Sequence, residues 1–419
     1  MTEPGANTPF VAIACGGTGG HLFPGLAVAE QLTRRGCAVA LLISPKNIDQ
    51  QAVKSARGME IITLPAVALQ SRNYFSFARS FWQSWRASRK MFKSHPPRAV
   101  LAMGGFTSAP PILAAKKLGA KTFLHESNTI PGRANHFLAR FVDEVFVGFP
   151  EAVARFRGIS SDRIKVTGTP VRRQFSASAN VVGRDSVEPK IAQCRAALGL
   201  EPNLPTILVT GGSQGAGGIN EMILSALPLL AGRDWQWLHL TGAADFEKVK
   251  QAYATHGYRA VVKPFLAEMD LALGAATVAV SRAGASSLAE LAALRLPSLL
   301  VPFPAAAGNH QFFNASAFVA NGAARMLVQK DTTPEKVAAL LVELIENEAA
   351  RRTMQVALAQ WDAPKAAEEI AENILRACWS SSFSLPARTV PLDGTELQQT
   401  RGQGCPRSDA IEQHHFSTV

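Results

Sequence analysis

Short apolar segments alternate with longer amphipathic segments along most of the chain. Each apolar segment is followed by a loop and then by apolar residues at helical spacing, which is typical of a parallel β-sheet with connecting helices. The predicted strands of the first half are residues 10–15, 38–44, 60–64, 99–103, 121–125 and 144–149. Those of the second half are residues 206–212, 235–242, 259–265, 277–284 and 297–303. Residues 334–361 are predicted to be helical. The pattern therefore predicts an α/β protein with doubly wound sheets.

A polar stretch rich in small residues, 174–190, interrupts this alternation and is predicted to be a linker. After it the pattern restarts with TILVTGG, which resembles VAIACGG near the N-terminus and forms a weak internal repeat. We therefore predict two Rossmann-like domains facing a cleft, over residues 1–172 and 173–378. The last predicted helix, AAEEIAENILRACW, is a candidate to pack back on the first domain. The polar segment 379–419 is predicted to be a disordered tail.

Two glycine-rich segments follow predicted strands at equivalent places in the two halves. These are GGTGGH, residues 16–21, and GGSQGAGG, residues 211–218. After the first of them, a helix is predicted to begin near Pro24. Free N–H groups at a helix N-terminus bind anions, and glycines let phosphate oxygens approach the backbone closely. We therefore predict a phosphate-containing ligand at both loops.

Dinucleotide binding is the commonest alternative for a strand, a glycine loop and a helix in this order. The spacing argues against it, because Leu22 and Asn220 stand where the third glycine is expected. No acidic residue ends the second strand either, where the sequence reads ALLISPKN. A nucleotide-binding oxidoreductase is therefore disfavoured. His21, beside the first loop, is either a hydrogen-bonding residue at a helix start or a catalytic group.

The composition adds expectations about surroundings and partners. The chain has 419 residues, a net charge of +11 and five scattered cysteines. Without a CxxC pair, these cysteines indicate neither a disulfide framework nor a zinc site, and they fit a reducing compartment. The first residues lack the features of a signal peptide, and no apolar segment is long enough to span a membrane. The basic balance favours acidic partners such as nucleic acid, anionic membranes or phosphorylated substrates.

Six motifs follow one another along the chain. They are GGTGGHLFPGLAVAE, MGGFTSAP, LHESNTIPGRAN, VTGTPVR, GGSQGAGGIN and SRAGASSLAELAALRLPSLLVPFPAAAGNHQFFNA. Together they closely resemble the bacterial MurG family, over roughly residues 10–378. The resemblance implies a GT-B glycosyltransferase that inverts the transferred sugar and needs no cofactor or metal. It implies UDP-N-acetylglucosamine (UDP-GlcNAc) as donor and lipid I, an undecaprenyl-pyrophosphoryl N-acetylmuramyl (MurNAc) peptide, as acceptor. The product would be lipid II, a peptidoglycan precursor.

The resemblance also implies which residues bind the substrates. Matched position by position, they are Thr18, Gly19, Gly20, Asn128, Arg172, Ser213, Leu266, Ala285, Ser286, Ser287, Leu288, Ala289, Glu290 and Gln311. Arg172 is expected to interact with the phosphate charge. Residues 285–290 are expected to begin a helix that faces the diphosphate, and Glu290 is expected to bind the ribose hydroxyls. Leu266 is expected to contribute its backbone at the uracil edge. Gln311 is expected to read the sugar hydroxyls by both donating and accepting hydrogen bonds.

Two residues are candidates for the general base that deprotonates the acceptor's 4-hydroxyl. His21 is favoured, because a neutral imidazole with a reference pKa of about 6.5 can act as a base at cellular pH. Glu126 in HESN is the alternative, and His125 beside it is a candidate structural residue. Without a metal, glycine-loop amides and helix N-termini would stabilise the UDP leaving group.

Four positions depart from the pattern of the family. Ser127 stands where glutamine is usual, Thr169 where asparagine is usual, and Phe106 where tyrosine is frequent. His310 stands where some members carry glutamine. Phe106 can therefore be given no hydrogen-bonding role on the acceptor side.

The first half contains a basic and aromatic segment within a stretch, Ile61 to His125, that has no Asp or Glu. Residues 74–93 combine Phe75, Phe77, Phe81, Trp82, Trp85 and Phe92 with Arg79, Arg86, Arg89, Lys90 and Lys93. This composition suits contact with an anionic membrane, although an amphipathic helix docked on a sheet gives the same pattern. We therefore expect a peripheral protein at the cytoplasmic face of the inner membrane. No nucleic-acid-binding signature is present.

Two other functions remain open. A GT-B enzyme with a different lipid acceptor would share the fold, and a non-catalytic UDP-sugar-binding protein would share the donor residues. The first glycine loop with His21 and the acceptor-side motifs favour the transferase.

Overall fold

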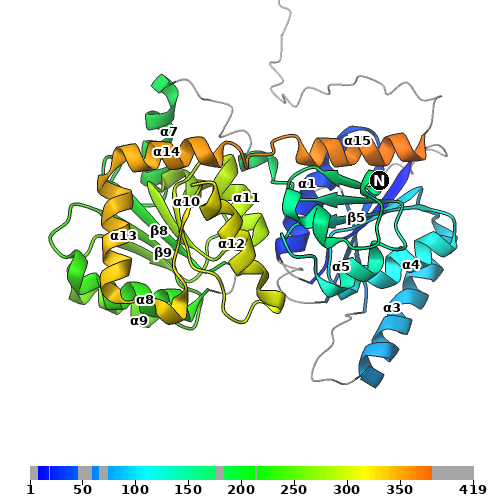
Figure 1. Ribbon diagram of the computed structural model, residues 1–419, viewed down its shortest axis with the longest axis horizontal. Coiled ribbons are helices and arrows are strands. Elements are labelled where there is room, and N and C mark those ends of the chain that lie inside the picture. The colour runs from blue at the N-terminus through cyan, green and yellow to red at the C-terminus, as the bar shows by residue number, and fades with distance from the viewer. Residues whose placement is uncertain are drawn as a thin grey trace, which may run out of the picture. The chain divides into compact units, whose positions relative to one another are not determined.

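The computed structural model describes residues 8–17, 19–45, 59–65, 74–175, 184–212 and 215–379, with only the backbone described for Tyr74 and residues 184–189. Two implied site residues, Thr18 and Ser213, lie outside these ranges, as does the predicted tail from residue 380 onward. The described residues form two parallel β-sheets flanked by helices (Figure 1). The predicted α/β fold class is thereby confirmed.

The first sheet has seven strands in the order β3-β2-β1-β4-β5-β6-β7. They are β1 (Phe10–Ala14), β2 (Ala38–Ile43), β3 (Glu60–Thr63), β4 (Ala99–Ala102), β5 (Lys121–Glu126), β6 (Glu144–Val147) and β7 (Ile164–Val166). All neighbouring strands are parallel. The chain winds outward from β1 to β3 and then returns to place β4 on the other side of β1. Doubly wound sheets bind ligands at such a reversal, beyond the carboxyl ends of the strands.

The second sheet repeats this winding with six strands in the order β10-β9-β8-β11-β12-β13. They are β8 (Thr206–Thr210), β9 (Gln236–Leu240), β10 (Ala260–Lys263), β11 (Val278–Ser281), β12 (Ser298–Leu300) and β13 (Arg325–Met326). The reversal here lies between β8 and β11. The two edge strands, β7 and β13, are absent from the predicted set because they are very short and lack a continuous apolar run.

The first sheet is buried on both faces, which explains its nearly continuous apolar strands. Its helices are α1 (Gly19–Arg34), α3 (Tyr74–Ser94), α4 (Ala109–Lys117) and α5 (Arg133–Leu138). Val11 and Ile13 of β1 belong to the hydrophobic cluster that contains α1, whereas Ala12 faces the cluster that contains α3 and α4. The alternation follows from the two-residue period of a strand.

The last helix, α15 (Ala366–Cys378), follows the second sheet in sequence but packs in the core of the first. Ile370 and Ile374 are fully buried in the cluster that contains α1. Arg35, which follows α1, forms ion pairs with Glu368 at 2.9 Å and with Glu372 at 3.3 Å. Figure 1 shows α15 in orange beside the blue α1. The chain therefore crosses between the halves twice.

The remaining helices surround the second sheet. They are α7 (Arg184–Ala197), α8 (Gly217–Ala226), α9 (Phe246–Thr255), α10 (Met269–Ala275), α11 (Ala285–Ala293), α12 (His310–Ala320), α13 (Pro334–Glu346) and α14 (Glu348–Leu358). Most of residues 334–361 are helical, as predicted, but they form two helices rather than one continuous helix. Asn347 separates α13 from α14, because its side chain accepts a hydrogen bond from the Ala350 N–H at 3.0 Å and caps a new helix.

Candidate active site

The candidate site residues gather at the carboxyl ends of the central strands of both sheets. In the first half, residues 15–17 follow β1, and residues 103–106 follow β4. In the second half, residues 211–212 follow β8, residues 215–216 precede α8, and residues 282–284 lead from β11 into α11. Since β1 pairs with β4 and β8 pairs with β11, these loops flank the reversal point of each sheet.

His21 lies in the first turn of α1 with its ring against the backbone of the MGGF motif. A Cβ atom at Gly104 would lie 2.9 Å from Nε2 of His21, and one at Gly105 would lie 3.4 Å from Cε1. Both glycines have positive φ angles, 118° and 78°. The close approach and the backbone conformation each require glycine, so the MGGF motif forms the surface on which the imidazole rests.

Glu126 ends β5 and is almost fully buried. Its Oε1 accepts hydrogen bonds from the N–H and the Nδ2 of Asn128, both at 2.9 Å. Its Oε2 accepts from the Gly132 N–H at 2.9 Å and from Nδ2 of Asn135 at 2.8 Å. Each carboxylate oxygen therefore already has two donors. This arrangement suits a residue that holds the loop before α5 better than one that takes up a proton.

His125 is fully buried, and its hydrogen bonds define its tautomer. Nε2 donates to the carbonyl oxygen of Gly168 at 3.0 Å, so Nδ1 is the acceptor for Oγ of Ser127 at 3.2 Å. Burial, with a smaller contribution from the charge of His21, lowers the pKa of His125 to about 4, although the hydrogen bond to Gly168 acts in the opposite direction. A neutral histidine with both nitrogens engaged is structural. Ser127, which departs from the family pattern, has its partner here.

Asn314 of α12 joins the two halves through both ends of its fully buried amide. Oδ1 accepts hydrogen bonds from the N–H and the hydroxyl of Thr129, at 2.9 and 3.0 Å. Nδ2 donates to Oδ1 of Asn128 at 3.0 Å and to the carbonyl oxygen of Ala283 at 3.2 Å. Asn128 therefore connects Asn314 to Glu126. The sequence motifs contain Asn314, but they do not distinguish it from its neighbours.

The first helix begins at Gly19, so the prediction of a start near Pro24 is wrong. Proline is tolerated in the first turns because the first N–H groups of a helix have no intrahelical partner. Pro24 nevertheless lacks the N–H that would bond to the carbonyl of Gly20. This carbonyl accepts instead from Oγ of Ser286, in the first turn of α11, at 3.0 Å. This hydrogen bond joins the N-terminal turns of α1 and α11, both of which are predicted to bind substrate.

Arg172 and Glu290 lie beside each other, with Nη2 and Oε1 separated by 3.8 Å. Each side chain is only 14% exposed. The guanidinium lies over the rings of Phe23 and Phe175, at 4.3 and 5.0 Å from their centroids. Burial raises the pKa of Glu290 to about 7, although the charge of Arg172 acts in the opposite direction. A cation and a titrating carboxyl group are thus available at one place.

This raised pKa predicts that stability of the ligand-free protein falls with rising pH. The folded state binds the Glu290 proton more tightly than the unfolded state, so ionisation between about pH 4.5 and pH 7 costs about 3 kcal/mol. Glu290→Gln should remove this penalty and stabilise the protein by about that amount above pH 7. Denaturant unfolding at about pH 5 and pH 8 measures the difference. A stability difference between variant and parent that does not change with pH would contradict the prediction.

Gln311 offers less to a ligand than the sequence suggests. Its Oε1 accepts from the Phe303 N–H at 2.9 Å and from the Ala283 N–H at 3.3 Å. The amide oxygen therefore holds the loops after β11 and β12. The expectation that Gln311 both donates and accepts is not met in this arrangement, because only Nε2 remains to donate to a ligand.

The other implied residues divide into buried and accessible ones. Leu266 and Leu288 pack in the core of the second half, so only their backbone groups can face a ligand. Ala285 is also buried, whereas Gly19, Gly20, Ser287 and Ala289 are not. Because α11 follows Gly284 directly, its first N–H groups are available for an anion.

Arg282 is a buried cation at this edge that the sequence analysis did not single out. Its Nη1 donates to the carbonyl oxygens of Val301 and Pro302 and to Oε1 of Gln329, at 3.0 to 3.2 Å. Burial lowers the pKa of Arg282. The guanidinium fastens the loop after β12 to the loop after β11. The sequence feature that could have identified Arg282 is its position directly after an apolar strand.

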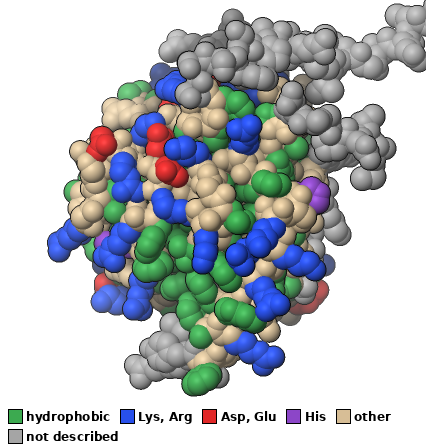
Figure 2. Space-filling model, turned by 90° about the vertical axis from the view of Figure 1, so that its right-hand side faces the viewer, with side chains coloured by type: hydrophobic (Ala, Val, Ile, Leu, Met, Phe, Trp, Pro, Cys, Tyr) green, Lys and Arg blue, Asp and Glu red, His purple; other side chains and the backbone are tan. Residues whose placement is uncertain are grey.

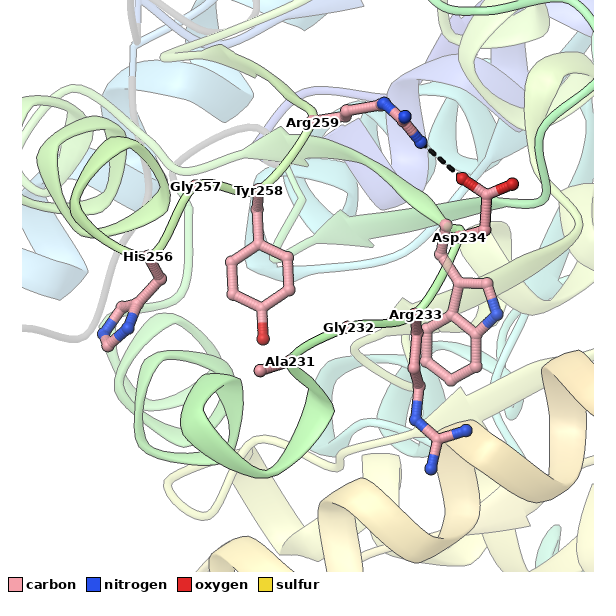
Figure 3. A pocket seen from close by; sticks show the side chains of 9 residues that line it. Ala231, Gly232, Arg233, Asp234, His256, Gly257, Tyr258 and Arg259 are labelled. Carbon is pink, nitrogen blue, oxygen red and sulfur yellow. Dashed lines mark hydrogen bonds and ion pairs between the residues drawn. The ribbon is translucent and has the colours of Figure 1, made fainter.

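The described residues form no metal centre at this site, and a cavity in the second half lies away from it. Among the residues that the structure describes, no group of three His, Cys, Asp or Glu side chains could hold a metal ion. A cavity of about 330 Å³ lies between residues 231–235 and 256–259, which precede β9 and β10 (Figure 3). It is therefore at the amino ends of these strands. The two arginines that line it, Arg233 and Arg259, are paired with Glu346 and Asp234.

The fold and the site define a class, that of GT-B glycosyltransferases. Residues 11–147 match the Glycosyltransferase family 28 N-terminal domain, and residues 206–372 match the Glycosyltransferase family 28 C-terminal domain. The solved structure of Acinetobacter baumannii MurG is similar, with a TM-score of 0.67 and 27% identity over 88% of this chain and 99% of that one. A putative UDP-N-acetylglucosamine 2-epimerase from Listeria monocytogenes has the same TM-score at 15% identity, which shows the fold alone.

Curated relatives narrow the class. A protein of Anaeromyxobacter sp. (strain K) is 35% identical over 393 residues, covering 88% of this chain and 94% of the relative. A protein of Listeria monocytogenes serotype 4a (strain HCC23) is 33% identical over 380 residues, covering 87% and 98%. Both carry the name UDP-N-acetylglucosamine--N-acetylmuramyl-(pentapeptide) pyrophosphoryl-undecaprenol N-acetylglucosamine transferase. The chain belongs to this family, the MurG family of glycosyltransferases.

Proposed function

We propose that the protein transfers N-acetylglucosamine from UDP-GlcNAc to the 4-hydroxyl of the MurNAc sugar of lipid I, with inversion at C1, and so forms lipid II. The observation that carries this proposal is the likeness to the named transferases over 94 to 98% of their length. In this proposal the first half, up to about residue 172, binds the lipid acceptor. The second half binds the donor.

The donor is proposed to lie across the starts of α1 and α11. Free N–H groups at these helix starts and in the glycine loops, with Thr18 and Ser213, would stabilise the charge of the departing UDP. Arg172 would add a cation, and Glu290 would accept hydrogen bonds from the ribose. Gln311 would donate from Nε2 to the sugar.

His21 is proposed as the general base. It lies on the acceptor half, next to Gly20, whose carbonyl oxygen accepts a hydrogen bond from Ser286 of α11, so a hydroxyl at its ring would be close to a donor at α11. The imidazole would take the hydroxyl proton while the oxygen attacks C1 and the bond to the UDP oxygen breaks. Direct attack of this kind inverts the configuration. Glu126, with four hydrogen bonds already made, would position the acceptor loop.

The rates of UDP release with different sugar donors and different acceptors test this proposal. UDP release should be fast only when UDP-GlcNAc and a soluble lipid I analogue are both present, and slow with UDP-glucose or UDP-N-acetylgalactosamine. A diacylglycerol in place of the analogue tests the alternative lipid acceptor. Faster release with diacylglycerol would favour that alternative and contradict the proposal.

We also propose that α3 contacts the anionic inner surface of the cell membrane, where the lipid acceptor resides. Phe75 and Trp82 are 93% and 52% exposed. Exposed cations flank them, namely Arg79, Arg86, Lys90 and Lys93. Figure 2 shows this side of the molecule, with more basic than acidic side chains around hydrophobic ones. Phe92 is an exception to the expectation, because it is buried in the core of the first sheet. None of the described helices is long and apolar enough to cross a membrane.

Changing the exposed aromatics should weaken membrane binding. We expect Phe75→Ser combined with Trp82→Ser to reduce co-sedimentation with vesicles containing phosphatidylglycerol by about tenfold, because two large apolar groups no longer insert. Val356→Ser is the matched control, since Val356 is 70% exposed on α14 of the other half. Equal sedimentation of the parent with anionic and neutral vesicles, or none with either, would count against the proposal.

A further inference from the structure

Asn135, in α5, carries a buried acceptor atom without a partner. The residue is 3% exposed, and its Oδ1 makes no hydrogen bond among the described residues. A buried polar atom of this kind is destabilising unless a ligand or an ordered water satisfies it. Four of the other unpartnered atoms, in Ser84, Arg89, Ser298 and Trp361, belong to residues that neither the motifs nor the contacts described above connect with the candidate site.

The amide of Asn135 lies beside the proposed base. A Cβ atom at Gly104 would meet Nε2 of His21 at 2.9 Å and Nδ2 of Asn135 at 3.2 Å. Both side chains therefore converge on the same point of the backbone. Their closeness depends on Gly104, which comes from the loop after β4.

The orientation of this amide follows from its partner. Oε2 of Glu126 can only accept hydrogen bonds when ionised, so the Asn135 atom at 2.8 Å from it must be the nitrogen. The oxygen is then the end that is not held by Glu126. Glu126 is in turn held by Asn128, whose Oδ1 accepts from Asn314 of the second half. The polarity of the amide is thus determined by a chain of hydrogen bonds.

We propose that Asn135 is a further acceptor-binding residue, whose Oδ1 accepts a hydrogen bond from an N–H or O–H group of the sugar that His21 deprotonates. This inference rests on the proposed function. An N-acetylated sugar offers such donors in its acetamido N–H and its free hydroxyls. Glu126 is the positioning residue that directs the amide oxygen toward the sugar.

Kinetics of single and double variants test the proposal. Asn135→Ala should raise KM for a soluble lipid I analogue by about tenfold and leave KM for UDP-GlcNAc within about twofold. Glu126→Gln replaces one acceptor oxygen by NH₂, so it disturbs the amide and should raise the same KM. In the double variant the two effects should not add, because they act on one hydrogen bond. If Glu126 were instead the base, Glu126→Gln would lower kcat by 100-fold or more in both backgrounds, which would overturn the assignment.

Asn135→Asp is a second test of the proposal, for use if the Asn135→Ala variant does not fold. Two carboxyl groups this close share a proton, which leaves an oxygen toward the sugar. KM for the analogue should then stay within about threefold of the parent. Asn220→Ala is the matched control, because Asn220 is equally buried but lies in the second half. It should lower the melting temperature without changing acceptor KM.

Calorimetric binding of the analogue separates this inference from the proposed function. A parent that binds the analogue but does not transfer sugar would contradict the function, and weaker binding by Asn135→Ala would still support the inference. A parent that transfers sugar, with unchanged acceptor binding and KM in Asn135→Ala, would overturn the inference alone. A parent that neither binds nor transfers would contradict both.

Discussion

Replacing His21 by alanine is expected to lower kcat by about 10²- to 10⁴-fold at saturating concentrations of both substrates. The imidazole lies against the MGGF backbone, and in the proposed mechanism it is the base that deprotonates the acceptor hydroxyl. KM for UDP-GlcNAc should change little, since α11 and Glu290 belong to the other half. Single-turnover measurements of sugar transfer give the effect on the chemical step directly.

His125→Gln provides the matched control for this prediction. His125 is a histidine of the same half, in β5, but it is neutral, and both its nitrogens are engaged. Its replacement should lower stability and leave kcat within about tenfold of the parent. Near-normal turnover by His21→Ala would contradict the assignment of the base. So would a larger loss of kcat in His125→Gln than in His21→Ala.

Replacing Asn314 by leucine should destabilise the protein by about 2 to 4 kcal/mol, because four buried hydrogen-bonding groups lose their partner at once. The melting temperature should fall by roughly 5 to 10 °C. Acceptor KM should also rise, since Asn128 and Glu126 lose their connection to the second half. Calorimetric melting and steady-state kinetics measure the two effects.

Asn321→Leu is the control on the same helix. Asn321 directly follows α12, is exposed, and its side chain donates to the carbonyl oxygen of Ala317. Its replacement should change stability by no more than about 0.5 kcal/mol. Equal destabilisation by the two leucine variants would show that the buried amide of Asn314 does not join the halves.

The winding of both sheets could be predicted because their central strands are buried on both faces and therefore read as continuous apolar segments. The positions of the glycine-rich segments could be predicted as well, because these segments come directly after such strands. The short edge strand β13 could not be predicted, because two residues carry no periodicity. The start of α1 was misplaced because proline is usual near a helix start, and the free carbonyl of Gly20 has its partner 266 positions away.

The motifs predict which residues belong to the candidate site, but they do not predict the hydrogen bonds that these residues make. The motifs contain Asn135 and Asn314, yet nothing local distinguishes a buried asparagine with a structural role from one that binds a ligand. The partner of Asn314 in the first half, Thr129, is 185 positions away. The engagement of Oε1 of Gln311 likewise depends on two backbone groups from different loops. Such roles follow from tertiary contacts, which the sequence pattern does not contain.

The structure of the reaction product tests the central claim most directly. The protein would be incubated with radiolabelled UDP-GlcNAc and a soluble lipid I analogue, and the lipid product analysed by mass spectrometry and NMR. We expect one N-acetylglucosamine joined through a β linkage to the 4-oxygen of the MurNAc sugar, with one UDP released for each disaccharide formed. An α linkage, attachment elsewhere, or UDP release without a disaccharide would contradict the account.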